Sequence, residues 1–251
     1  MKPIALQLYT LREKAEQDPI WVLKTVAETG YKGVELAGTY GMKPVELAKI
    51  ISDLGMTIPS AHMALPTPET INASVDECKS LGVDFLVTGF GPDDMTTLDS
   101  AKACAEKFQT AAELLKPHGI GFAFHNHWWE FTNIFDGKTA YQVILESAPD
   151  ADSELDVYWC ADGKNDPVEM VGKYSSRIPL LHIKDGDLNP DRMHKAVGSG
   201  KLDMMGIIGS ADKNVLKWII VEMDNCATDM VDAVKQSYKY LTSNGLAMGN
   251  K

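Results

Sequence analysis

The sequence predicts a closed (β/α)8 barrel that occupies the whole chain, residues 1–251, as a single domain. Short apolar runs alternate with longer amphipathic segments from one end of the chain to the other. Eight such pairs follow one another, and no proline-rich or serine-rich linker, charge block or low-complexity tract separates them. This alternation is typical of βα units around a parallel sheet, and eight uninterrupted units favour one closed barrel over an open sheet.

The eight expected strands are short runs rich in apolar and β-branched residues. They cover residues 4–9, 33–36, 57–62, 85–88, 121–126, 154–157, 180–183 and 218–222. Apolar residues at three-to-four spacing predict helices at about residues 18–29, 44–54, 68–81, 96–117, 138–148, 167–173, 203–210 and 228–243. Gly30, Gly55, Gly82 and Gly119 each follow a helical run, where a left-handed residue ends a helix. Residues 246–251 are a tail without an assigned element.

Composition and charge narrow the classes of function. The chain is 45% hydrophobic, which is enough for a sizeable core, and its formal net charge is -11. Proteins that bind nucleic acids use clustered Lys and Arg to neutralise phosphates, so we expect no nucleic-acid partner. The four cysteines form no CxxC pair, and neither a thiolate zinc site nor a redox motif is indicated.

The sequence also bears on location. No stretch approaches the roughly 18–20 apolar residues that span a bilayer, and the first residues run directly into an expected strand rather than into a signal-peptide core. We therefore expect no membrane contact and a cytoplasmic protein, or a periplasmic one if an export signal has been removed. Homo-oligomer formation is left open.

Charged side chains end the last three expected strands. Asp156, His182 and Glu222 each lie in or just after an apolar run. In a barrel the reactive groups lie at the carboxyl ends of the strands, so these three side chains should meet. Burying a charge is costly unless it is paired or bound to a metal, and a mixture of oxygen and nitrogen ligands suits a divalent cation. A salt bridge at the rim is the alternative for each residue alone, but repetition on three strands favours a metal.

The fifth expected strand leads into the most unusual segment of the chain. His125 and His127 share one face of the strand, where imidazoles could ligate a metal, move a proton or bind sugar hydroxyls. Trp128 and Trp129 offer flat apolar surfaces that either stack on a sugar ring or simply pack. Glu130 would be the loop carboxylate that completes the ligand set.

Hydrogen-bonding side chains recur at the other strand ends. Gln7 and Tyr9 follow the first strand, Glu35 the second and His62 the third. Such groups suit a polyhydroxyl substrate, although each alone could be a strand-end cap or a satisfied core residue. The turn at 198–200, Gly-Ser-Gly, could cradle an anion with its backbone amides or be a plain turn.

Several motifs along nearly the whole chain are shared with one group of enzymes. They are Gln7-Leu8-Tyr9-Thr10-Leu11-Arg12, Gly33-Val34-Glu35-Leu36, His125-Asn126-His127 with Glu130-Phe131, Leu155-Asp156-Val157-Tyr158-Trp159, Leu181-His182-Ile183-Lys184-Asp185, Val197-Gly198-Ser199-Gly200 and Val221-Glu222-Met223-Asp224-Asn225. Together they resemble the sugar isomerase and epimerase superfamily with the xylose isomerase-like barrel, which also includes inosose dehydratases and DNA repair enzymes of the endonuclease IV type.

The resemblance implies one divalent metal ion, manganese, magnesium, cobalt or zinc, held by a Glu, an Asp, a His and a second Glu. Asp156, His182 and Glu222 match the last three of these positions. Epimerases of the superfamily place the first Glu within the fifth strand, where this chain has other residues. We therefore expect Glu130 as the first ligand, with His127 as the alternative.

The implied reaction is isomerisation or epimerisation of a keto-sugar or related polyol through an enediolate, with Glu222 and a fifth-strand residue as the proton-transferring pair. Elimination from the same enediolate would make the enzyme a lyase or dehydratase on a keto-sugar, keto-inositol or 3-keto-glycoside, with His125 or His127 as general acid. A sugar-binding barrel without catalysis is a further alternative.

We also expect contacts to the carbohydrate from Trp128, Lys184 and Asp224. No clear phosphate clamp of Arg and Lys is visible. The candidates are Arg12, Lys184 and Arg192, and each is better explained as a solvated charge or as a donor to a hydroxyl group. The sequence therefore favours a substrate that is not phosphorylated.

Overall fold

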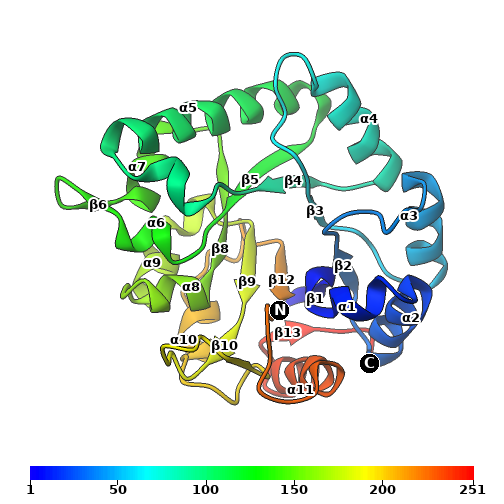
Figure 1. The fold of residues 1–251 in the computed structure, drawn as a ribbon. Coiled ribbons are helices and arrows are strands. Elements are labelled where there is room, and N and C mark those ends of the chain that lie inside the picture. The colour runs from blue at the N-terminus through cyan, green and yellow to red at the C-terminus, as the bar shows by residue number, and fades with distance from the viewer.

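The computed structural model describes residues 1–251 and confirms the predicted barrel (Figure 1). Its eight strands are β1 (Lys2–Gln7), β2 (Gly33–Glu35), β3 (Ser60–His62), β4 (Phe85–Thr88), β5 (Gly121–His125), β8 (Asp152–Asp156), β9 (Leu180–Ile183) and β12 (Trp218–Val221). Neighbouring strands pair in parallel, and β1 joins β2 to β12. Between β2 and β3 only the bridges Gly33 to Thr57 and Leu36 to Ala61 are formed, so the barrel is nearly closed.

All eight expected helices are present, and Figure 1 shows them arranged around the strands. They are α2 (Pro19–Thr29), α3 (Pro44–Asp53), α4 (Ile71–Leu81), α5 (Leu98–Leu115), α7 (Ala140–Ser147), α9 (Pro167–Tyr174), α10 (Met204–Gly209) and α11 (Met230–Ser243). The four glycines expected to end helices all have positive φ, between 70° and 114°. None of the helices combines the length and the apolar character that a membrane span requires.

Short elements that the sequence pattern did not predict lie mostly in the loops. The helices are α1 (Arg12–Ala15), α6 (Trp129–Thr132) and α8 (Val157–Asp162), with 3-10 turns η1 (Leu8–Leu11), η2 (Pro92–Met95), η3 (Lys116–His118) and η4 (Ser175–Arg177). Two small hairpins are formed by β6 (Ile134–Phe135) with β7 (Lys138–Thr139) and by β10 (Asp185–Gly186) with β11 (His194–Lys195). The tail contains β13 (Ala247–Met248), which pairs in parallel with β1. Helices of only one or two turns are too short to show a periodic spacing of apolar residues in the sequence.

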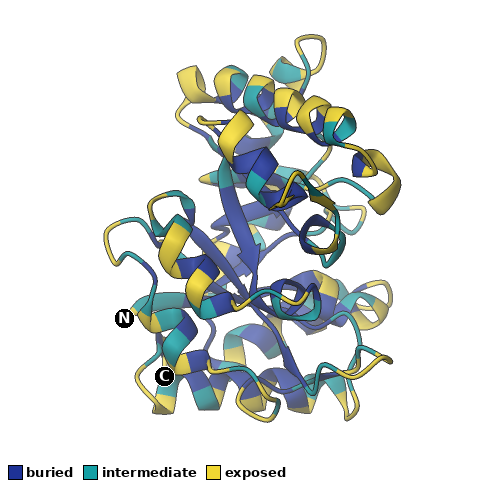
Figure 2. Cartoon of the chain, turned by 90° about the vertical axis from the view of Figure 1, so that its left-hand side faces the viewer, coloured by how far each residue is buried: buried dark blue, intermediate teal, exposed yellow.

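The apolar core lies mainly between the strands and the helices, whose outer faces are exposed (Figure 2). Inside the barrel the buried apolar side chains form one thin layer, made by Ala5, Val87, Ala123, Leu180 and Ile220. Because side chains alternate along a strand, the residue two positions further on faces inward as well. On four of these strands that residue is polar: Gln7, His125, His182 and Glu222. The thin layer therefore separates the closed end of the barrel from a polar interior.

Shortening a side chain of this inner layer should destabilise the whole barrel. Ile220 is fully buried, so Ile220→Ala should lower the free energy of unfolding by roughly 2–5 kcal/mol, because it removes buried methylenes and leaves a cavity. Urea denaturation followed by circular dichroism measures this. Val45→Ala, at a position that is 64% exposed, is the matched control and should change stability little. Equal stability of both variants would contradict a packed inner layer.

Candidate active site

The inward-facing polar residues are brought together by the strand registers. Gln7 of β1 lies beside Glu35 of β2, and the register of β8 places Glu154 beside His125 of β5 and Asp156 beside His182 of β9. All six are buried. Glu154 was not singled out from the sequence, although its spacing of two residues from Asp156 puts both carboxylates on the same face of β8.

Glu35 anchors the first part of this network. Its carboxylate accepts hydrogen bonds from Gln7 Nε2 at 2.7 Å and from the Ser60 hydroxyl, and its Oε1 lies 2.6 Å from His182 Nε2. Burial is the largest influence on the pKa of Glu35 and would raise it, but the attraction of His182 and His62 outweighs burial and holds the pKa well below its usual value. Glu35 is therefore an ionised anchor for the imidazole of His182.

Glu154 is surrounded by three imidazoles. Its Oε2 lies 2.8 Å from His62 Nε2, 3.1 Å from His182 Nε2 and 3.3 Å from His125 Nδ1. Burial and repulsion by Glu35 raise the pKa of Glu154. His62 responds in the opposite way: burial would lower its pKa, but Glu35 and Glu154 together raise it to about 10.

A second group of charges surrounds Lys184 at the carboxyl ends of β8, β9 and β12. Lys184 Nζ lies 3.1 Å from Asp156 Oδ2, 2.7 Å from Glu222 Oε2 and 2.7 Å from Asp224 Oδ2. His182 Nδ1 lies 3.0 Å from the same oxygen of Glu222. Burial raises the pKa of Asp156 to about 6, whereas Lys184 and His182 overcome the effect of burial on Glu222 and hold its pKa well below the usual value.

Asp156 divides its two carboxylate oxygens between two tasks. Oδ1 accepts the backbone N–H of Trp159 at 2.8 Å and so caps α8, while the side chain of Asn126 bonds the main chain of Asp156 in both directions. Oδ2 is buried and has no hydrogen-bond partner, although Lys184 lies within ion-pair distance. The carboxylate is thus held rigidly with one oxygen available to a ligand.

Of the four predicted metal ligands, the structure brings three together. Asp156, His182 and Glu222 offer ligand atoms that lie within 4.8 Å of one another, and the fourth member of this group is His125. Glu130 is not in the group, because the chain turns into α6 after His127 and the Glu130 carboxylate accepts the backbone N–H of His127 at 2.8 Å. Burial raises the pKa of Glu130 to about 8.

A hollow of about 430 Å³ opens above these residues at the mouth of the barrel. It is lined by Gln7, Tyr9, Ala37, His62, Gly89, Phe90, Gly91, His125, His127, Trp129, Glu222 and Asp224. Besides Glu222, six of these residues were predicted as contacts to a substrate or as catalytic residues: Gln7, Tyr9, His62, His125, His127 and Asp224. Glu35 and Lys184, which were also predicted, are buried beneath the hollow and do not line it.

The two tryptophans after β5 take different places. Trp129 lines the hollow and stacks on His127 with ring centroids 4.1 Å apart. Trp128, the predicted contact to a sugar, is not among the residues that line the hollow. Its ring packs against Trp159 and carries the Arg192 guanidinium 3.8 Å from its centroid.

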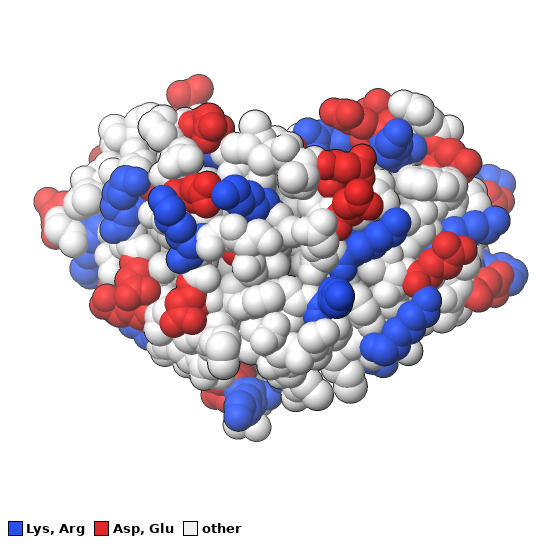
Figure 3. Space-filling view, turned by 90° about the horizontal axis from the view of Figure 1, so that it is seen from below, with Lys and Arg blue, Asp and Glu red and all other residues white.

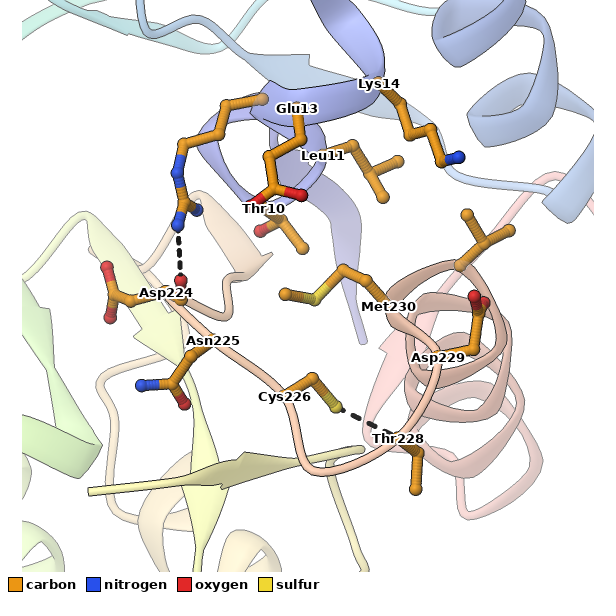
Figure 4. A pocket seen from close by; sticks show the side chains of 12 residues that line it. Thr10, Leu11, Glu13, Lys14, Asp224, Asn225, Cys226, Thr228, Asp229 and Met230 are labelled. Carbon is orange, nitrogen blue, oxygen red and sulfur yellow. Dashed lines mark hydrogen bonds between the residues drawn. The ribbon is translucent and has the colours of Figure 1, made fainter. Parts of the chain in front are cut away.

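A second hollow, of about 400 Å³, lies beside the mouth (Figure 4). It is enclosed by residues 10–14 and by the loop from Asp224 to the start of α11. Asp224, which is labelled in Figure 4, lines both hollows. Its backbone oxygen accepts a hydrogen bond from the Arg12 guanidinium at 2.8 Å. No sequence signal pointed to this hollow.

The Gly-Ser-Gly turn cradles an anion, and that anion belongs to the chain itself. The Asp185 carboxylate accepts the backbone N–H groups of Gly198 and Gly200, both at 2.9 Å, and of Leu202 at 3.3 Å. The basic residues considered for phosphate binding are engaged as well. Arg12 bonds to backbone oxygens, and Arg192 pairs with Asp162 at 2.9 Å. On the face shown in Figure 3, acidic and basic side chains are interspersed.

A parallel barrel with carboxylates and histidines at the carboxyl ends of its later strands defines the class of protein, and sequence comparison agrees. Residues 23–244 match the family model described as xylose isomerase-like TIM barrel. The chain belongs to this family. Among curated proteins, none matches the chain.

Solved structures of similar fold include enzymes of different kinds. A sugar phosphate isomerase/epimerase from Parabacteroides distasonis ATCC 8503 has 27% sequence identity and a TM-score of 0.84, with 98% of this chain and 96% of that chain covered. The probable 3-DHS dehydratase AsbF from Bacillus anthracis has 14% identity and a TM-score of 0.75, covering 96% and 99%. The IOLI protein with a bound zinc atom has 14% identity and a TM-score of 0.71, covering 99% and 100%. At such low identity the last two show the fold alone.

The charges around Glu154 lead to a prediction for the metal-free protein. A histidine whose pKa is raised from about 6.5 to about 10 on folding stabilises the fold fully below pH 6.5 and loses that contribution as the pH rises towards 10. The free energy of unfolding should therefore fall between pH 6.5 and 10, measured by urea denaturation in the presence of EDTA. His62→Gln keeps a donor but does not titrate, so its decline should be shallower. An identical pH dependence of both proteins would contradict the assignment.

Proposed function

We propose that this protein is a divalent-metal-dependent sugar isomerase or epimerase that acts on a keto-sugar or related polyol through an enediolate intermediate. The observation that carries the proposal is the convergence of Asp156, His182 and Glu222, with donor atoms within 4.8 Å of one another, beneath a hollow of about 430 Å³. The kinship to isomerases and epimerases of the same family supports it.

The donor set fits a divalent cation. Two carboxylates and an imidazole supply oxygen and nitrogen ligands, and Asp156 Oδ2 is buried without a hydrogen-bond partner. Nε2 of His182 faces Glu35, so its Nδ1 is turned towards Glu222. A carboxylate on the far nitrogen fixes the orientation and tautomer of a ligating imidazole. We propose His125 as the fourth ligand in place of Glu130, because it is the residue of β5 whose ligand atom lies in this group.

A bound divalent ion would supply Lewis-acid polarisation of a sugar carbonyl and the neighbouring hydroxyl. Side chains of the protein would transfer the proton and stabilise the developing charge. Glu222 is ionised at neutral pH, because Lys184 and His182 lie next to it, and it can accept the proton from the carbon between the two oxygens. Lys184 holds Asp156, Glu222 and Asp224 in place while its charge favours the developing enediolate.

His125 is the second partner for proton transfer. It lies in the same group as Glu222 and also lines the hollow. Burial and the nearby His182 hold its pKa well below the usual value, so its imidazole is neutral and can accept a proton on the other side of the substrate from Glu222. Return of the proton from Glu222 to the neighbouring carbon gives isomerisation and needs no second acid. Return from the opposite face gives epimerisation, and for this His125 would first take up a proton from solvent through the hollow that it lines.

Elimination is the second candidate function, because a dehydratase shares the fold. The protonation states of the two histidines that were predicted as general acids argue against elimination. The pKa of His127 is lowered to about 4, mainly by burial, and that of His125 is lowered as well. Neither ring therefore carries an extra proton for a leaving group at neutral pH. The engaged state of Arg12, Lys184 and Arg192 supports a substrate without a phosphate group.

The metal content of variants tests the ligand set. Asp156→Asn should bind one divalent ion fewer per chain than the unaltered protein, because the amide supplies no charge at the mouth. His182→Ala should lose the same ion. Metal analysis after dialysis against Mn²⁺ measures both. Asp152→Asn, on the same face of β8 but outside both ligand groups, is the control and should keep full occupancy. Unchanged metal content in Asp156→Asn would contradict the proposed site.

The reaction type is tested by solvent exchange. The metal-loaded protein is incubated with ketoses and keto-sugars in deuterated water and the products are followed by NMR. We expect deuterium at one carbon next to the carbonyl and an epimer or isomer as product, with Glu222→Gln at least roughly 100-fold slower because the proton acceptor is lost. An unsaturated or cleaved product would identify a lyase instead. Tight sugar binding without exchange would indicate a binding protein.

A further inference from the structure

The interior of the barrel holds a second group of ligand atoms beneath the mouth. His62 of β3, His125 of β5, Glu154 of β8 and His182 of β9 each offer one ligand atom, and these atoms lie within 4.8 Å of one another. The proposed reaction uses Asp156 and Glu222 but assigns no task to Glu154. The proposed reaction therefore does not account for this deeper group of His62, His125, Glu154 and His182.

Two atoms of this group are buried without a hydrogen-bond partner. They are Oε1 of Glu154, whose side chain is fully buried, and Nδ1 of His125, which is 5% exposed. His125 Nδ1 lies 3.3 Å from Glu154 Oε2 but is not aligned for a hydrogen bond. Buried polar atoms are nearly always paired, since an unpaired one costs free energy. A cation bound among them would give His125 Nδ1 a partner, and it would also satisfy Glu154 Oε1 if the carboxylate bound it through both oxygens.

The spacing of the donors is that of ligands around one ion. The nitrogens of His62, His182 and His125 lie 2.8, 3.1 and 3.3 Å from Glu154 Oε2. Ligand atoms at about 2.1 Å from a metal are separated from one another by about 3.0–3.4 Å in octahedral or tetrahedral coordination. The strands thus hold the three nitrogens at about this separation from Glu154 Oε2, and all four ligand atoms lie within 4.8 Å of one another.

The charge balance of the interior also favours a second bound cation. Without a metal, His62 and His182 supply part of the compensating charge, because nearby carboxylates raise their pKa values. An imidazole must be neutral to bind a metal, and in that form one ammonium group, Lys184, lies among five carboxylates, so the net charge is -4 when all of these are ionised. The five carboxylates are those of Glu35, Glu154, Asp156, Glu222 and Asp224. A single divalent ion at the mouth would halve this charge, and a second would remove it. Uncompensated buried charge is strongly unfavourable.

We propose that the barrel interior contains a second divalent-cation position, formed by His62, His125, Glu154 and His182. Three imidazole nitrogens and one carboxylate oxygen are a ligand set that suits Zn²⁺. His125 and His182 belong to both groups. His182 can serve both positions, because its Nδ1 faces Glu222 at the mouth and its Nε2 faces Glu154 below. With an ion on each nitrogen, the ring is an imidazolate that no longer donates to Glu35, and the proton that it loses passes to solvent. The inner ion would hold His182 in place for the outer site.

The test separates the two positions by removing the outer one. Protein stripped with EDTA is titrated with Zn²⁺ by calorimetry, and bound zinc is counted after gel filtration. Asp156→Asn should still bind one ion per chain, and the double variants Asp156→Asn/Glu154→Gln and Asp156→Asn/His62→Ala should bind none. Asp156→Asn/Asp152→Asn is the control and should keep the ion. Circular dichroism checks that each variant is folded, and the two double variants alter different strands.

Each outcome decides the matter. Loss of all zinc in Asp156→Asn alone would overturn the inner position. Zinc that remains bound in both double variants, Asp156→Asn/Glu154→Gln and Asp156→Asn/His62→Ala, would overturn it as well. The proposed function is judged by a different comparison. If the unaltered protein binds no more zinc than Asp156→Asn, the outer site is wrong while the inner one stands.

Discussion

The imidazole of His182 is the contact on which the rest of the site depends. Its Nε2 lies 2.6 Å from Glu35 and its Nδ1 lies 3.0 Å from Glu222, so one fully buried ring links β2, β9 and β12 across the barrel. Gln7 and Ser60 fix Glu35 in turn. A ring held from both sides cannot rotate, and its position sets where the carboxylates at the mouth converge.

The barrel can hold so many charges because its inner apolar layer is thin. Only Ala5, Val87, Ala123, Leu180 and Ile220 fill the closed end, and every inward position above them is free for polar side chains. Burial makes each charge depend on its neighbours. Lys184 is the clearest case, since burial would lower its pKa but Asp156, Glu222 and Asp224 hold it well above the usual value. The ammonium therefore stays charged and binds three carboxylates into one unit.

The sequence predicted the barrel and the convergence of Asp156, His182 and Glu222, because strand ends in a parallel barrel meet at one rim. It did not predict which residue of the fifth unit joins them. Glu130 was expected for its charge, yet α6 is a single turn without a periodic pattern, and that turn directs its carboxylate to the backbone of His127. Trp128, at the start of the same turn, does not line the hollow and packs against Trp159 instead. Glu154 could be found only from its spacing of two residues from Asp156, which puts both carboxylates on the inner face of β8. The anion bound by the glycine turn is Asp185, 13 residues before Gly198, and no local pattern connects the two.

The most direct measurement of the central claim is a crystal structure of the protein grown with Mn²⁺, with an anomalous difference map calculated at the manganese absorption edge. The account predicts a strong peak at the mouth of the barrel, at coordination distance from Asp156 Oδ2, His182 Nδ1 and Glu222. A map without a peak bounded by these three side chains, from crystals in which they are well ordered, would contradict it.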